Sequence, residues 1–148
     1  MKAKLLKTSI LLIIFFASCQ KEPYTPLPYV DVNIQLFPNS TQYIDINTIG
    51  GFVYLTANYP SRGIIVYRLT DSEFLAFERT CPHDPDACCT GNQCSRLVVD
   101  QSRLTISDAS CCKSVFLILD GSNVSGPSQY RLKQYHTSYD GTVLHIYD

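Results

Sequence analysis

Six of the seven cysteines in this chain of 148 residues lie between Thr80 and Phe116, and their arrangement constrains the fold more than any other feature. One segment begins with Cys-Pro-His at residues 81–83, and a second contains Cys-Cys at residues 111–112. Both segments are rich in side chains that can bind a metal. We therefore expect the two segments to come together and form one shared site. Because thiols serve both as metal ligands and as disulfide partners, the site holds either a metal centre or covalent bridges.

The amino-terminal segment is typical of a secretory signal. Residues 1–7 carry three lysines and no acidic residue, residues 10–16 are apolar, and Ala17-Ser18 are small. The apolar run is too short to span a bilayer as a mature helix. Phe-Ala-Ser-Cys at residues 16–19 resembles a bacterial lipobox, in which the cysteine becomes the lipid-bearing first residue. We therefore expect removal of residues 1–18 and lipidation of Cys19.

Residues 19–29 are expected to tether the domain to the membrane. Three prolines in this segment predict a stiff, extended spacer. Gln20-Lys21-Glu22 is similar to the short tether of surface-exposed lipoproteins of the Bacteroides group. This resemblance implies an outer-membrane lipoprotein on the periplasmic or surface face, with the membrane as its partner through the lipid on Cys19.

The even number of cysteines beyond the anchor favours disulfide bonds, because an exported domain folds in an oxidising compartment. Neighbouring α-carbons across a trans peptide are about 3.8 Å apart, which is below the usual disulfide separation. Adjacent cysteines are therefore not expected to bond each other, and bridges are expected to run between the two segments. The candidates are Cys81, Cys88, Cys89, Cys94, Cys111 and Cys112.

The rest of the chain predicts an all-β domain at residues 30–148, with a smaller loop-bearing subdomain at about 81–127. A hairpin of residues 63–69 and 74–78 leads directly into Cys81, and Asp140-Gly141 joins a closing hairpin of residues 132–139 and 142–147. Further strands are expected at residues 30–36, 43–46, 52–56, 97–99, 104–106 and 115–119, whereas residues 84–93 are expected to be loop.

Charge and motif content exclude several classes of function. The net charge is −1 and no basic run follows residue 7, so nucleic acid is not expected as a partner. We find no nucleophile–base arrangement and no phosphate-binding glycine loop, so no enzymatic reaction is predicted. Four acidic residues near the cysteine segments are expected to be solvated: Glu78, Asp84, Asp86 and Asp108.

The order of these features resembles the Rieske-type iron–sulfur domain. GIIVYRLTDSEFLAFERTCPH is similar to the hairpin that enters the first ligand loop, and CCKSVFLILDGS is similar to the end of the second loop. VSGPSQYRLKQYHTSYDGTVLHI is similar to the third, Gly-Pro loop and the closing hairpin. The resemblance covers roughly residues 63–147. It implies Rieske-like antiparallel sheets with a small inserted subdomain.

The ligand pattern of that family is incomplete in this chain. A Rieske centre uses two thiolates and two imidazoles, and Cys81 and His83 match the first loop. In the second loop the resemblance puts Ala109 at the position of the second thiolate and Cys112 at that of the second histidine, while Lys113 replaces a glycine. The family's usual bridge implies a partner for Cys111 in Cys88 or Cys89.

Three forms of the site follow from this resemblance. In the first, which the sequence favours, no cofactor is bound and disulfides join Cys88 or Cys89 to Cys111 or Cys112, with Cys81 bonded to the remaining thiol. In the second, a [2Fe–2S] cluster is held by Cys81, His83, Cys112 and a fourth thiolate such as Cys89, Cys88 or Cys94. The third and least favoured form is a zinc site made from the same groups.

Two functions correspond to these forms. The first is a lipid-anchored, non-catalytic binding or assembly module, stapled by disulfides, with an unknown envelope protein as partner. The second is an electron-transfer protein with an unusual [2Fe–2S] cluster. His136 and His145 lie on the predicted final hairpin and are expected to be strand residues rather than ligands.

Overall fold

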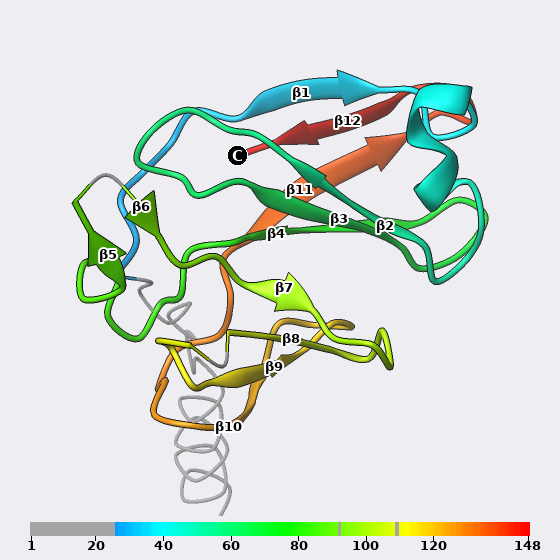
Figure 1. The fold of residues 1–148 in the computed structure, drawn as a ribbon. Coiled ribbons are helices and arrows are strands. Elements are labelled where there is room, and N and C mark those ends of the chain that lie inside the picture. Colours follow the sequence, from blue (N-terminus) through cyan, green and yellow to red (C-terminus); the bar gives the residue numbers. More distant parts are fainter. Residues whose placement is uncertain (1–25, 92, 109) are drawn as a thin grey trace, which may run out of the picture.

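The computed structural model describes residues 26–91, 93–108 and 110–148, and within these ranges the protein is all-β. Most strands belong to two antiparallel sheets, which Figure 1 shows one above the other. The strands are β1 (Asn33–Leu36), β2 (Phe52–Leu55), β3 (Ile64–Arg68), β4 (Phe74–Glu78), β5 (Cys89–Thr90), β6 (Gln93–Cys94), β7 (Val98–Val99), β8 (Thr105–Ser107), β9 (Val115–Leu117), β10 (Asn123–Ser125), β11 (Gln134–Tyr139) and β12 (Leu144–Tyr147).

The larger sheet has the strand order β1-β12-β11-β4-β3-β2 and separates two hydrophobic cores. On β3, Ile64 and Val66 pack in the first core, and Ile65 and Tyr67 pack in the second. All five residues of β3 are buried, and the first four are apolar because both faces of the strand pack in a core. The predicted strand at 63–69 and its hairpin with β4 are confirmed.

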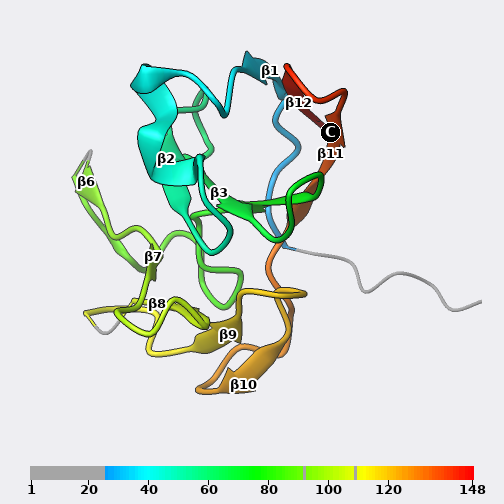
Figure 2. The same ribbon diagram turned by 90° about the vertical axis from the view of Figure 1, so that its right-hand side faces the viewer.

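The first core lies inside the curve of this sheet. In Figure 2, β11 and β12 stand on one side of the curve, and β2 and the 3-10 helix η2 (Thr41–Ile46) stand on the other. Burial of each large apolar side chain contributes about 1.5–3 kcal/mol. The fully or almost fully buried members are Val30, Val32, Leu36, Ile46, Ile64, Val66, Phe74, Ala76, Tyr135, Leu144 and Ile146.

The smaller sheet, of order β10-β9-β8-β7, is inserted in the chain between β4 and β11. Its buried apolar residues, Val99, Ile106 and Phe116, face the underside of the larger sheet and complete the second core. The buried members are Ile65, Tyr67, Phe77, Cys81, Leu97, Val99, Ile106, Cys112, Phe116, Ile118 and Leu132. Two cysteines thus lie within an apolar core, and a separate two-stranded hairpin, β5–β6, carries two more.

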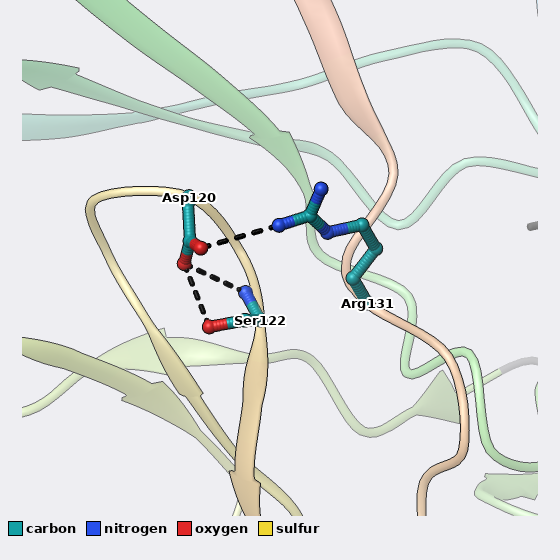
Figure 3. Close-up of polar contacts among 3 residues, drawn as sticks. All are labelled: Asp120, Ser122 and Arg131. Atoms are coloured by element: carbon teal, nitrogen blue, oxygen red, sulfur yellow. Dashed lines mark hydrogen bonds and ion pairs between the residues drawn. The ribbon is translucent and has the colours of Figure 1, made fainter. Parts of the chain in front are cut away.

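A polar clamp ties the smaller sheet to the segment that returns to β11. The Asp120 carboxylate accepts the N–H of Ser122 at 3.0 Å, its hydroxyl at 2.8 Å and the Arg131 guanidinium at 3.2 Å (Figure 3). These hydrogen bonds, from the Ser122 backbone and then its hydroxyl, lower the pKa of Asp120. Because both charged partners are half exposed, the ion pair contributes about 0–1 kcal/mol. The clamp therefore fixes the turn after β9 against the segment that leads to β11.

Two predicted elements are wrong. Residues 43–46, expected to be a strand, belong to η2, and Ile44 of this segment is 65% exposed. Residues 84–93, expected to be loop, contain β5 and the start of β6. Four residues of alternating polarity are too few to distinguish a strand from a helical turn, and two-residue strands leave no periodic signal.

Other predicted strands are confirmed with shifted ends. In residues 30–36 the alternate apolar side chains Val30, Val32 and Leu36 are buried in the first core and Ile34 is partly buried against it, but the hydrogen-bonded strand β1 covers only the last four positions. It pairs with β12, which ends at Tyr147 opposite Asn33. The closing hairpin β11–β12 turns at Asp140, whose carboxylate accepts the N–H groups of Thr142 and Val143.

Some expectations lie outside the described residues. These are the signal at 1–18, the lipidated Cys19, most of the tether at 19–29, and Ala109. Within the part of the chain that the structure describes, no helix has the length and apolar character needed to cross a membrane.

Candidate functional site

The tips of the two cysteine segments meet through the Cys81–Cys112 disulfide, whose α-carbons are 6.0 Å apart. β4 leads into Cys81, and the backbone stays paired beyond the strand because Arg79 donates its N–H to Gly63 and accepts one from Leu97. Cys81 and Cys112 are each 3% exposed and pack in the second core. The apolar surroundings and the covalent bond fix both loop tips against the underside of the larger sheet.

The other four cysteines form two further disulfides. Cys88 bonds Cys111 with α-carbons 5.6 Å apart, and Cys89 bonds Cys94 with α-carbons 4.0 Å apart. Neither adjacent pair is bonded internally, in agreement with the geometric expectation. The expectation that bridges run between the segments is wrong for Cys89–Cys94, because these residues face each other across the β5–β6 hairpin. That hairpin was not visible in the sequence.

The groups expected to bind a metal do not offer a ligand set in this oxidised form. Cys81 is bonded to Cys112, and Cys89 is bonded to Cys94, so none of these four cysteines is a thiolate, the form that coordinates metals. His83 is exposed, and its described contact is a backbone N–H that donates to Cys81 Sγ at 3.4 Å. Across residues 26–91, 93–108 and 110–148, no group of three or more His, Cys, Asp or Glu side chains could hold a metal ion.

The Gly126-Pro127 loop packs directly on the second cysteine segment. A Cβ atom at Gly126 would collide with the Lys113 carbonyl oxygen and with Ser114, so only glycine permits this approach. The N–H of Ser128 donates to Ser114 Oγ at 3.0 Å and closes the contact. Lys113 itself has a φ of +55°, in the left-handed region that favours glycine. The position where the family resemblance has a glycine therefore keeps a glycine-like backbone.

Of the four acidic residues near the cysteine segments, Asp84 and Asp86 are exposed as expected. Glu78 and Asp108 are only 3% and 8% exposed, so the expectation that all four are merely solvated is wrong for these two. A buried carboxylate requires hydrogen-bond donors in place of water. Asp108 finds such donors in its own loop, and Glu78 finds them in three different segments of the chain.

Glu78 accepts five hydrogen bonds. Its Oε1 accepts the N–H of Arg62 at 3.0 Å, the N–H of Thr80 at 2.9 Å and the Thr80 hydroxyl at 2.6 Å. Its Oε2 accepts the hydroxyls of Ser61 at 2.6 Å and Tyr135 at 2.7 Å. Burial first, and then the charge of Glu78, raise the pKa of Tyr135. The carboxylate thereby joins the end of β4, the 61–62 loop and β11 immediately before Cys81.

Asp108 organises the second cysteine segment. Its Oδ1 accepts the N–H of Ser110 at 2.8 Å and the Ser110 hydroxyl at 2.5 Å, and its carbonyl oxygen accepts the N–H of Lys113 at 2.9 Å. Burial alone raises the pKa of Asp108. Hydrogen bonds from Ser110 and from the backbone of Cys112 and Cys111 outweigh that effect and lower the pKa below its ordinary value.

Arg62 contacts the first cysteine segment, and the sequence alone gave no sign of this contact. Its Nη1 donates to the Ser95 carbonyl at 2.9 Å, and its Nη2 donates to the Pro85 carbonyl and to Cys89 Sγ, the latter at 3.0 Å. Burial lowers the pKa of Arg62, and three nearby carboxylates act in the opposite direction (Glu78, Asp86 and Asp108). Arg62 lies between β2 and β3, 27 residues from Cys89 in the sequence, so no local pattern connects the two.

The two histidines of the closing hairpin lie on strands, as predicted. His136 of β11 is exposed and stacks on Tyr147 of β12, with ring centroids 5.4 Å apart. His145 of β12 pairs with Gln35 of β1 and Ser138 of β11. Both belong to the larger sheet rather than to the cysteine segments.

No family model matches this chain, and no curated protein matches it. Within the described residues, the site consists of three disulfides, two buried carboxylates and one arginine that contacts a disulfide sulfur. Chemically, this arrangement restrains the loops through covalent bonds and hydrogen bonds. Its buried sulfurs are held within disulfides, and its buried carboxylates accept hydrogen bonds from neighbouring loops and from Tyr135 of β11.

Proposed function

We propose that this protein is a non-catalytic binding or assembly module of the cell envelope, built on a Rieske-like β domain whose cluster position is closed by disulfides. The lipid on Cys19 holds it to the outer membrane, and its partner is another envelope protein. The observation that carries the proposal is the Cys81–Cys112 disulfide, buried between the two loop tips.

Three features support the Rieske-like scaffold, and they occur along the chain in the same order as in Rieske-type domains. The β3–β4 hairpin runs directly into Cys-Pro-His, and a smaller antiparallel sheet is inserted between β4 and β11. The Gly126-Pro127 loop then packs on the second cysteine segment before the closing hairpin. A scaffold carries no function by itself, so the binding role rests on the chemistry of the closed site.

The closed site supports a role without catalysis. A sulfur in a disulfide lacks the nucleophilicity of a thiolate, and both sulfurs of Cys81–Cys112 are shielded by apolar side chains. The buried carboxylates of Glu78 and Asp108 accept hydrogen bonds from loop groups. These interactions give a rigid surface around the loop tips, which reduces the entropy lost when a partner binds.

Support for the membrane anchor comes from the sequence, since residues 1–25 lie outside the described part of the chain. The test is fractionation of cells that produce the full-length protein. The wild type is expected in the outer-membrane fraction with a lipid-modified Cys19 as its first residue, and Cys19→Ala is expected in the soluble fraction. Gln20→Ala, which keeps the thiol, is the control. Membrane retention of Cys19→Ala contradicts the anchor.

Analysis of the native protein for iron and free thiols tests the closed site. After anaerobic purification we expect colourless protein with no iron and none of the six domain cysteines alkylated before reduction. About two irons and two sulfides per chain would instead support the electron-transfer alternative, with Cys81, His83, Cys112 and Cys89 as candidate ligands. Three or more free thiols in colourless protein contradict both functions.

A further inference from the structure

An open groove runs beside the β5–β6 hairpin, and the Cys89–Cys94 disulfide forms part of its wall. The groove has a volume of about 490 Å³ and is also lined by Tyr59, Pro60, Arg62 and Arg96. Tyr59 is 95% exposed at its rim. Among the described lining residues are both cysteines of this disulfide and neither cysteine of the other two. A molecule in the groove therefore reaches this disulfide first.

The two sulfurs of this disulfide differ in their surroundings. Arg62 Nη2 donates to Cys89 Sγ at 3.0 Å, and the same guanidinium is held by the carbonyls of Ser95 and Pro85. No such cation contact to Cys94 Sγ is found in the described residues. A fixed positive charge beside one sulfur stabilises that sulfur as a thiolate and makes it the better leaving group in exchange.

We propose that Cys89–Cys94 is a thiol–disulfide exchange site that reacts with thiols entering the groove, whether small thiols or the cysteine of a polypeptide. The thiolate of the incoming molecule forms a bond to Cys94 Sγ, and the Cys89–Cys94 bond breaks. Its electron pair goes to Cys89 Sγ, where the Arg62 guanidinium stabilises the charge. The thiolate of a second thiol then attacks the external sulfur of the mixed disulfide, the bond from that sulfur to Cys94 Sγ breaks, and its electron pair goes to Cys94 Sγ, which takes up a proton. Two external thiols are thereby oxidised to one disulfide, and Cys89 and Cys94 are reduced to two thiols.

The Cys81–Cys112 disulfide is protected from this reaction by burial, and Cys88–Cys111, although half-buried like Cys89–Cys94, does not line the groove. Cys81 and Cys112 are each 3% exposed, so a thiol cannot reach them without opening the second core. Cys89–Cys94 also closes the shortest loop, with a sequence separation of 5 residues against 23 and 31 for the others. Opening it releases one short hairpin and leaves both links between the cysteine segments in place. The site is thus reducible without loss of the fold.

Reaction of the full-length protein with reduced glutathione at pH 7 tests the proposal. Free thiols are trapped with iodoacetamide at successive times and located by mass spectrometry. We expect the first glutathione adduct on Cys94, and alkylation of Cys89 and Cys94 before any other cysteine. A first adduct on Cys89, or earlier opening of Cys88–Cys111 or Cys81–Cys112, overturns the proposal.

Variants of Arg62 test its role in stabilising the leaving thiolate. Arg62→Gln is expected to slow the first exchange by about threefold or more. This is the effect expected when loss of the positive charge makes the leaving thiol of Cys89 roughly tenfold less acidic. Arg62→Lys keeps the charge and is expected to retain most of the rate, while Arg96→Gln, in the same groove, is the control. An unchanged or faster rate in folded Arg62→Gln overturns the assignment. Early alkylation of the buried Cys81 would show that Arg62→Gln is unfolded. In that case the position of the first glutathione adduct on the wild-type protein, Cys94 or Cys89, tests the proposal.

Discussion

The six-stranded sheet and the segment inserted between β4 and β11 are stabilised by different means. Strands of the larger sheet have four to six residues and share a core of aliphatic and aromatic side chains. Strands of the inserted sheet have two or three residues, and this segment contains all three disulfides. Where strands are too short to supply a full core, covalent bonds provide the missing restraint.

The largest effect is expected from the core of the larger sheet. Phe74 is 3% exposed and packs edge-on against Tyr139. Phe74→Ala is expected to lower the free energy of unfolding by about 3–5 kcal/mol, because it removes buried surface and leaves a cavity. Urea denaturation measures this value, and Phe37→Ala, at a position 52% exposed, is the control. A loss similar to that of the control would show that this core does not hold the sheet.

Removal of the buried disulfide is the corresponding test for the inserted segment. The Cys81→Ala, Cys112→Ala double variant is expected to lose about 4 kcal/mol, the loop-closure value for a separation of 31 residues. The Cys89→Ala, Cys94→Ala double variant is expected to lose about 2 kcal/mol for a separation of 5 residues. Thermal unfolding compares the stability losses of the two double variants. A larger loss without Cys89–Cys94 would contradict the assignment of the buried Cys81–Cys112 bridge as the main link.

Glu78 connects the two regions, so its replacement tests their junction. Glu78→Gln turns one acceptor oxygen into a donor and leaves some of its partners without a hydrogen bond. We expect a loss of about 1–3 kcal/mol in the free energy of unfolding. Glu73→Gln, at an exposed turn, is the matched control. Equal melting temperatures for the two variants would show that the junction does not depend on this carboxylate.

The smallest effect is a dependence on pH through Asp108. Its pKa is lowered in the folded protein, so its ionised form contributes stability above the unfolded-state pKa of about 4. This contribution is lost as the pH falls through the lower folded-state pKa. We expect the stability advantage of the wild type over Asp108→Asn to be constant from pH 5 to 7 and to shrink below about pH 4. A constant difference down to pH 2 would contradict the lowered pKa.

The sequence predicted the larger sheet better than the inserted segment, for physical reasons. Residues 30–36 alternate apolar and polar side chains and so indicated a strand, and Asp140-Gly141 located the closing hairpin, because these signals are local. The β5–β6 hairpin has two residues in each strand, too few for periodicity, so its Cys89–Cys94 bridge was missed.

The site was predicted only in part because its contacts are distant in sequence. The cysteine spacing indicated that the two segments meet, and adjacency excluded bonds within each Cys-Cys pair. The partners of Glu78 include Ser61 and Tyr135, which are 17 and 57 residues away. Arg62 reaches Cys89 only because β3 and the first cysteine segment are brought together by folding. No short sequence pattern encodes such contacts.

Hydrogen exchange with and without reductant tests the central claim most directly. After all three disulfides are opened, we expect the amides of β8 and β9 to lose protection by at least about tenfold, while those of β3 and β4 change little. That result would show that covalent bonds hold the inserted segment and that apolar packing holds the sheet. Equal losses in both regions, or no loss in β8 and β9, would contradict the account.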